Sequence, residues 1–171
     1  MKRILITLIF IFIISLSLSG SKQISIETQS KLLVKIITYD KAIDRYGEPI
    51  IIGVSSFKMK KALNMLHIKI KGKKFIVKKM NSTEDIKKYK VVYIDYNWQD
   101  KYEKIGKIIK KHPCLIFCND SDLVEAGVGA VSFKTIKDRA KIIVNLGNAK
   151  SQGARFVPAF LRITIIIGRV N

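Results

Sequence analysis

The sequence predicts an α/β domain with a doubly wound, mostly parallel sheet, and two observations indicate this fold class. Near-continuous apolar runs within 91–97 and 113–119 lack polar alternation, so we expect both to be strands covered on two faces. The segment between them has the period of a helix and ends before Pro113, which cannot continue one. Two buried strands joined by a helix form a β-α-β unit, and its right-handed crossover is the expected start of a doubly wound sheet.

Helices and strands also alternate in the residues before this unit. An apolar stripe predicts a first helix over 23–40, and Ser55 or Ser56 is placed to cap a second one. Acidic residues after Asn81 indicate the start of a third, short helix that ends near Tyr89. The expected strands in this part are Ile50–Val54 and Phe75–Val77.

The residues after the central unit predict a hairpin between two small helices. A turn near Asp138 joins the two strands into an antiparallel hairpin, which we expect at or beside the edge of the sheet. Gly153 ends the second small helix. In order, these elements are a helix over about 122–125, strands at 130–133 and 142–144, and a helix over 146–152.

A last helix is expected at the C-terminal end of the domain. Pro158 suits its first turn, and the helix is predicted to run to about Ile167. Because this segment is apolar nearly all round, we expect it to be buried or to rest on an apolar surface.

The first residues have the layout of a secretory signal peptide. Lys2 and Arg3 precede an apolar run at 4–18 that is shorter than the ~20 residues of a membrane-spanning helix. Small residues follow, and cleavage after Ser19 or after Gly20 fits equally well. The sequence therefore predicts a signal peptide at 1–19 and a single exported domain at 20–171, with an uncleaved anchor as the alternative.

The charge is strongly positive, and its composition limits what it means. The formal charge is +19, and the basic residues are 26 lysines and 6 arginines. Arginine is the residue suited to bidentate contacts with phosphates and bases, so this balance and the export signal both argue against a nucleic-acid partner. We interpret the lysines as a solvated surface; the alternative is affinity for an anionic surface, such as lipid headgroups, an acidic partner or a wall polymer.

The two cysteines, Cys114 and Cys118, lie four residues apart in an expected strand. At ~3.3 Å per residue, their Cα atoms are ~13 Å apart. A disulfide needs less than ~7 Å, so we expect none between Cys114 and Cys118. Both are interpreted as buried free thiols, with an intermolecular bridge or a redox switch as the alternative.

Candidate catalytic residues occur only singly. Asp95 and Asp120 follow neighbouring strands, where α/β sheets hold their sites, but no partner motif accompanies them. His67 and His112 follow helical stripes and are interpreted as structural. The segment Gly53–Ser56 joins a strand to a helix but lacks the glycine and lysine pattern of a phosphate loop. We therefore expect no enzyme activity and no bound metal or cofactor.

Several structural motifs together are similar to one family. They are 31–36, 51–54, Gly129–Phe133, Ile143–Leu146, Ala149, Gly153 and Phe160–Ile163. Over about residues 25–170 this pattern resembles the YfiR-like family of periplasmic regulators. The resemblance implies a fold of the Rossmann or flavodoxin kind with N- and C-terminal helices, and a non-enzymatic role.

In that family the implied role is to restrain an inner-membrane diguanylate cyclase and so to tune cyclic-di-GMP and biofilm formation. An outer-membrane lipoprotein or a redox change relieves the restraint. The redox change uses disulfides, which Cys114 and Cys118 are not expected to form with each other.

These observations favour a periplasmic α/β regulator that binds a membrane signalling protein, either a cyclase or a kinase. The first and last helices are the expected interface for that partner or for a second copy of the chain, as in a homodimer. One alternative is a periplasmic small-ligand-binding protein with a pocket near Ser55, Ser56 and Asp95. Another is a hydrolase that uses Asp95 or Asp120.

Overall fold

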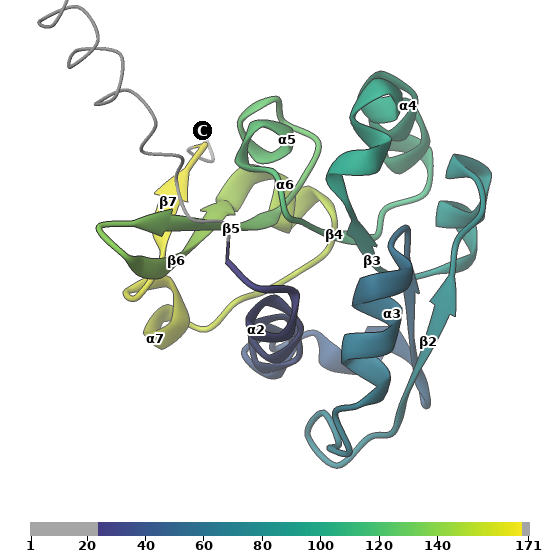
Figure 1. Ribbon diagram of the computed structural model, residues 1–171, viewed down its shortest axis with the longest axis horizontal. Helices are drawn as coiled ribbons and strands as arrows, with labels where there is room; N and C mark the ends of the chain where they lie inside the picture. Colours follow the sequence, from purple (N-terminus) through teal and green to yellow (C-terminus); the bar gives the residue numbers. More distant parts are fainter. Residues whose placement is uncertain (1–23, 169–171) are drawn as a thin grey trace, which may run out of the picture.

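The computed structural model describes residues 24–168, which form one sheet with helices on both of its faces (Figure 1). β1 to β5 are parallel, β6 is antiparallel to β5, and β7 is parallel to β6. The predicted fold class is therefore confirmed. The predicted signal peptide at 1–19, with cleavage after Ser19 or Gly20, lies outside the described residues. In sheet order, the strands are β2 (Phe75–Lys79), β1 (Ile50–Val54), β3 (Val91–Ile94), β4 (Leu115–Cys118), β5 (Val131–Ile136), β6 (Arg139–Asn145) and β7 (Ile165–Ile167).

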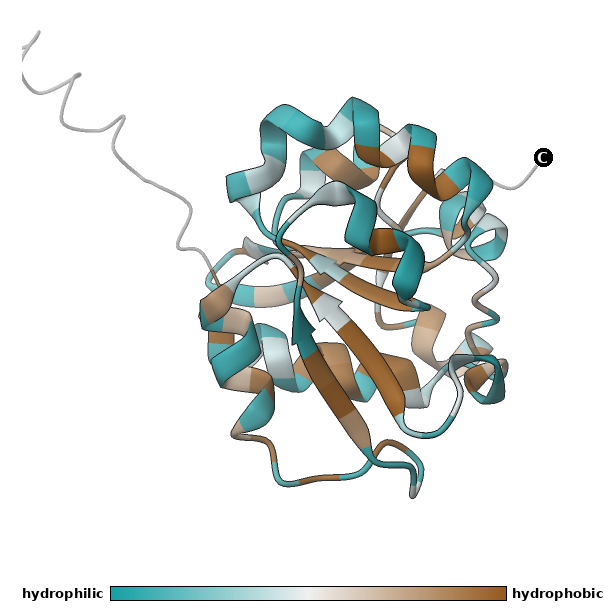
Figure 2. Ribbon diagram, turned by 90° about the vertical axis from the view of Figure 1, so that its right-hand side faces the viewer, coloured by the Kyte–Doolittle hydropathy of each residue, from teal (hydrophilic) through white to brown (hydrophobic). Residues whose placement is uncertain are grey.

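Two apolar clusters, one on each face, hold the helices against the sheet. Leu33, Met59 and Phe160 of α2, α3 and α7 belong to one cluster, and Ile105 and Leu123 of α4 and α5 belong to the other. Figure 2 shows the apolar strands between these two layers. The helices are α2 (Ile26–Thr38), α3 (Phe57–Asn64), α4 (Tyr102–Lys111), α5 (Ser121–Glu125), α6 (Leu146–Ser151) and α7 (Pro158–Leu161), and the 3-10 turns are η1 (Ile43–Tyr46), η2 (Thr83–Lys88) and η3 (Tyr96–Lys101).

Serine caps set the starts of the two long helices on the first face. The backbone N–H of Thr28 donates to Ser25 Oγ at 3.2 Å, and the N–H of Met59 donates to Ser56 Oγ at 3.4 Å. Each bond satisfies an N–H that has no partner inside its helix. The first two predicted helices are confirmed, and Ser56, not Ser55, caps the second.

The central β-α-β unit is also confirmed. β3 and β4 pair in parallel, and all their residues are buried, which explains the absence of polar alternation. Ile105, Ile108 and Ile109 form the buried stripe of α4, and the helix ends before Pro113. The 3-10 turn η3, which buries Trp98, precedes α4 and has no clear signal in the sequence.

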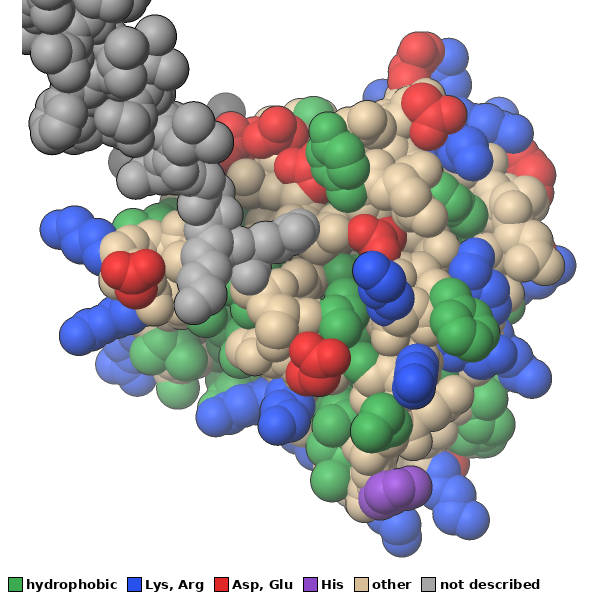
Figure 3. Space-filling view, viewed as in Figure 1, with side chains coloured by type: hydrophobic (Ala, Val, Ile, Leu, Met, Phe, Trp, Pro, Cys, Tyr) green, Lys and Arg blue, Asp and Glu red, His purple; other side chains and the backbone are tan. Residues whose placement is uncertain are grey.

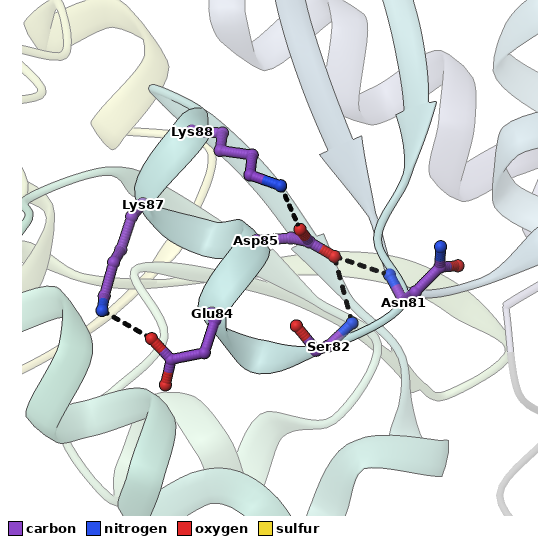
Figure 4. Close-up of polar contacts among 6 residues, drawn as sticks. All are labelled: Asn81, Ser82, Glu84, Asp85, Lys87 and Lys88. Atoms are coloured by element: carbon purple, nitrogen blue, oxygen red, sulfur yellow. Dashed lines mark hydrogen bonds and ion pairs between the residues drawn. The ribbon is translucent and has the colours of Figure 1, made fainter.

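The third predicted helix is the 3-10 turn η2, and a carboxylate fixes its start (Figure 4). Asp85 Oδ2 accepts hydrogen bonds from the backbone N–H groups of Asn81, at 2.9 Å, and Ser82, at 3.1 Å. Lys88 donates to the other oxygen at 2.6 Å. The bond from Lys88 and these backbone bonds lower the pKa of Asp85 to about 2.

The last predicted helix is wrong beyond Leu161. α7 is a single turn, and Ile165–Ile167 forms β7 beside β6. Isoleucine is β-branched and packs well on a sheet, and the open side of β6 offers main-chain hydrogen bonds that a helix could not use. The expected burial is confirmed for Phe160, which is fully buried, but not for Ile165 and Ile166, which are 37% and 46% exposed. The hairpin β5–β6 is therefore beside the edge strand, as expected, and is not the edge itself.

Candidate functional site

The carboxyl ends of β1, β3 and β4 meet where the sequence places its candidate site. Ser55 is fully buried, and its Oγ accepts a hydrogen bond from the backbone N–H of Asp95 at 2.7 Å. Asp95 Oδ1 in turn accepts from Asn119 Nδ2 at 2.6 Å and from the N–H of Tyr96 at 2.8 Å. These bonds tie three strand ends together, so both side chains are used to fix loops.

Asp120, the second candidate carboxylate, is used in the same way. Its Oδ1 accepts from the N–H of Asp122 at 2.9 Å and so caps α5, and its Oδ2 accepts from the Tyr102 hydroxyl at 3.0 Å. Burial and this hydrogen bond raise the pKa of Tyr102, which keeps the hydroxyl a neutral donor. Asp120 therefore links α4 to the loop after β4.

The polar side chains Ser55, Asp95 and Asp120 at the strand ends are engaged by hydrogen bonds within the domain. None of four surface depressions among the described residues is lined by Ser55, Ser56, Asp95 or Asp120. Within residues 24–168, no group of three His, Cys, Asp or Glu side chains is placed to hold a metal ion. The pocket expected near Ser55, Ser56 and Asp95 is not one of these four depressions.

The other candidate residues have structural surroundings. A side chain at Gly53 would place its Cβ 2.4 Å from the Tyr89 ring, so this glycine lets the ring pack against β1. His112 ends α4, and its backbone N–H donates to the Ile108 carbonyl at 2.9 Å. His67 is exposed and follows α3.

Cys114 and Cys118 are free, fully buried thiols; Cys114 directly precedes β4 and Cys118 is its last residue. The Cys118 thiol donates to the Asp120 carbonyl at 3.2 Å. Burial raises the pKa of Cys114 to about 12 and also raises the pKa of Cys118. Because the reactive form is an accessible thiolate, neither side chain has the surroundings of a redox switch.

A buried carboxyl group joins the N-terminal helix to the C-terminal segment. Asp40 Oδ1 accepts from the backbone N–H of Ala42 at 2.9 Å and from that of Arg155 at 2.8 Å, and Oδ2 accepts from the Tyr46 hydroxyl. We call this group the Asp40 clasp. Tyr39 also stacks on Phe160 with 5.3 Å between ring centroids. These contacts fix α7, and hence the start of β7, against α2.

Exposed apolar side chains gather around α3, among lysines. Phe57 is 70%, Met65 67% and Ile68 53% exposed. Figure 3 shows apolar side chains interspersed with basic ones over this region. We define the α3 surface as Phe57, Lys58, Lys60, Lys61, Met65 and Ile68.

The distribution of charged residues along the sequence marks the α3 surface, although the net charge of the whole chain does not. Between Pro49 and Thr83 there are nine lysines and no Asp, Glu or Arg. By contrast, acids near η2 and α4 pair with local lysines: Glu84 Oε2 lies 2.5 Å from Lys87 Nζ (Figure 4), and Glu103 Oε1 lies 2.6 Å from Lys107 Nζ. Lysines thus occur all along the chain, whereas the acidic residues that could pair with them are absent between Pro49 and Thr83.

A second apolar surface lies at the other end of the sheet. β7 is an edge strand of the described residues, and Ile165 and Ile166 are exposed on it, with Ile163 63% exposed beside it. We call these three residues the β7 edge. The predicted interface on the first helix has no such feature, because α2 buries Leu33, Ile36 and Ile37.

The described residues also contain no helix with the length and apolar character needed to cross a bilayer.

Comparisons with known proteins agree with the fold. A family model described as YfiR/HmsC-like matches residues 27–164. The comparison with curated proteins found no match. Among solved structures, the ABC domain in complex with L-Trp from Streptococcus pneumoniae is 14% identical over 81% of this chain and 62% of its own, with a TM-score of 0.57. A conserved domain protein from Vibrio cholerae O1 biovar El Tor is 14% identical over 85% of this chain and 60% of its own, with a TM-score of 0.53. The chain thus spans about three fifths of either structure, and the likeness is one of fold alone.

Proposed function

The chain belongs to the YfiR/HmsC-like family, and from this premise we propose that it is a periplasmic regulator that binds and restrains a membrane signalling protein such as a diguanylate cyclase. In this proposal the protein performs no chemistry of its own, and it tunes cyclic-di-GMP and biofilm formation through contact. An outer-membrane lipoprotein relieves the restraint. The signal peptide at 1–19, cleaved after Ser19 or Gly20, takes the domain to the periplasm.

The observation that carries the proposal is the β7 edge. An edge strand offers unpaired main-chain N–H and C=O groups, and an extended segment of another protein can add to it as a further strand. Side chains of Ile165 and Ile166 beside those groups add apolar contact area. The carboxyl ends of the strands offer nothing comparable, because Asp95 and Asp120 are engaged within the domain.

A second candidate, a small-ligand-binding protein, draws on the depression between α4 and α6. Tyr102, Ile109 and Val128 are among its lining residues. Its amides, however, are engaged: Gln152 Nε2 donates to the Val128 carbonyl at 2.7 Å and Asn148 Nδ2 to the Gly129 carbonyl at 2.8 Å. A ligand site needs polar groups that are free to orient the ligand, so this candidate has less support.

Cells that lack the chromosomal gene and carry it on a plasmid test the regulator. We expect the wild-type chain to lower cyclic-di-GMP and to co-purify with an integral membrane protein that has a cyclase or kinase domain. The Ile166→Lys variant should do neither, because a lysine on the edge strand opposes strand addition.

Ile76→Lys is the matched control, since Ile76 is 41% exposed on the opposite edge and Ile166 is 46% exposed. It should behave as wild type. If both variants lower cyclic-di-GMP like wild type, the β7 edge is not the contact. If the wild-type chain co-purifies with no membrane protein and leaves cyclic-di-GMP unchanged, the proposed function is wrong.

A further inference from the structure

We propose that the α3 surface docks the protein on an anionic lipid bilayer. This inference goes beyond the proposed function and stands on the chemistry of the α3 surface alone. In this proposal the α3 surface binds the membrane, whereas the β7 edge binds the signalling protein.

Unbalanced positive charge is the first part of the argument. α3 contains no acidic residue, and within the described residues no salt bridge engages Lys58, Lys60 or Lys61. Lys58 and Lys61 are exposed. Glu27 of α2 lines one depression together with Lys31, Lys58 and Lys61, so lysines outnumber the acid there. A cluster with this net positive charge is attracted to the negative surface potential of a membrane that contains anionic lipid.

Protruding apolar side chains are the second part. Phe57 begins α3, and Met65 caps its C-terminal end eight positions later, so both lie near the side of the helix that carries Lys61. Ile68 follows in the loop after α3. These residues, 53–70% exposed, are of the kind that enter the boundary between headgroups and acyl chains while neighbouring lysines contact phosphates.

Composition favours a lipid surface over a protein partner at this place. The hot spots of protein interfaces are enriched in Trp, Tyr and Arg, and the stretch from Pro49 to Thr83 contains none of the three. Its basic residues are all lysines, which act as point charges toward phosphates and do not form the bidentate bonds that arginine makes with carboxylates. Phe57, Met65 and Ile68 also project outward, and a fluid bilayer can accommodate them without a complementary groove.

The test measures co-sedimentation of the chain lacking residues 1–19 with two kinds of vesicle. One contains equal parts of phosphatidylglycerol and phosphatidylcholine, and the other contains phosphatidylcholine alone. We expect binding to the anionic vesicles only, and we expect it to weaken as salt is added. Substituting Lys58, Lys60 and Lys61 together by Gln should weaken binding by roughly a hundredfold. Phe57→Ser combined with Met65→Ser should weaken it by roughly tenfold.

The matched control replaces Lys110, Lys111 and Lys141 together by Gln, which removes the same charge from exposed positions outside the α3 surface. It should bind the anionic vesicles nearly as well as wild type. Urea unfolding of each variant checks that the substitutions leave the fold intact. Equal losses in the two triple variants would overturn the proposal, because binding would then depend on net charge alone. It would also be overturned if the wild-type chain bound neither kind of vesicle.

Neither outcome depends on the regulatory role. A chain that binds vesicles but leaves cyclic-di-GMP unchanged keeps the lipid proposal and loses the proposed function. A chain that lowers cyclic-di-GMP without binding vesicles does the reverse.

Discussion

The two edges of the sheet are built in opposite ways. The edge strand β2 carries Lys78 and Lys79, and Lys74 precedes it, whereas the edge strand β7 consists of three isoleucines. Lysines on an edge oppose the addition of another strand, and an exposed apolar edge without charged side chains permits it. The same position in the sheet is therefore closed at one end and open at the other, which is why we assign protein contact to the β7 edge.

The edges also differ in how they are held. β2 pairs with β1, and the α3 crossover between them makes its contacts local. β7 follows α7, which the Asp40 clasp and the stack of Tyr39 on Phe160 fix to the N-terminal helix, more than a hundred residues away in the sequence. The open edge therefore depends on distant parts of the chain, and the closed edge does not.

Phe160→Ala should have the largest effect on stability. Phe160 is fully buried and contacts Tyr39 and Phe156, so we expect the free energy of unfolding to fall by about 3–5 kcal/mol. Phe75→Ala, in the partly exposed first residue of β2, should cost less than about 2 kcal/mol. Urea unfolding measures both, and equal costs would contradict the difference in how the edges are held.

The Asp40 clasp should contribute the next largest effect. Asp40→Ala leaves two part-buried backbone N–H groups and the buried Tyr46 hydroxyl without their acceptor, and we expect a loss of about 2–3 kcal/mol. Asp44→Ala, near the β2 end, removes only an exposed ion pair with Lys73 and should change stability little. A loss in the Asp44 variant as large as that in the Asp40 variant would show that the clasp is not what holds the C-terminal segment.

Exchanging side chains between the edges should alter association more than stability. Lys78→Ile removes a guarding charge from β2, so we expect concentration-dependent self-association in sedimentation velocity experiments. Ile166→Lys should remain monomeric at the concentrations at which the Lys78→Ile variant associates. Both should keep the free energy of unfolding within about 0.5 kcal/mol of wild type, since these are surface positions. A monomeric Lys78→Ile variant would show that the lysine does not guard β2.

The smallest effect concerns acid stability near the closed edge. The bond from Lys88 holds the pKa of Asp85 at about 2 in the folded protein, below the ordinary value of 3.8. This contribution is fully present above that ordinary value and is lost as the pH falls toward 2. Asp85→Asn should therefore flatten the pH dependence of stability between these values. Urea unfolding midpoints across this pH range measure how steeply stability depends on pH. An unchanged dependence in the Asp85 variant would show that Asp85 does not contribute to it.

Elements whose type depends on a local sequence pattern could be predicted from the sequence. Elements whose type depends on pairing with a distant segment could not. β1, β3, α4 and β4 follow their apolar patterns closely, because burial on two faces leaves an uninterrupted run. The segment at 163–167 is apolar without a period, so the pattern alone does not distinguish a buried helix from a strand. Only the open side of β6, which is a property of the assembled sheet, makes it β7.

The candidate site shows the same limit. The sequence correctly places Asp95 and Asp120 after neighbouring strands, but it does not reveal their hydrogen-bond partners. Asp95 accepts from the Tyr96 N–H and the Asn119 amide, and Asp120 accepts from the Asp122 N–H and the Tyr102 hydroxyl. The α3 surface does have a signal in the sequence, because no Asp or Glu occurs between Pro49 and Thr83 among nine lysines.

Photo-crosslinking in living cells tests most directly whether the open edge is the contact surface. p-Benzoylphenylalanine is introduced in place of Ile166 in one strain and in place of Lys78 in another, and adducts are identified after irradiation. We expect the position on β7 to capture an integral membrane protein with a signalling domain, and the position on β2 to capture none. Capture from the β2 position alone, or from neither position, would contradict the account.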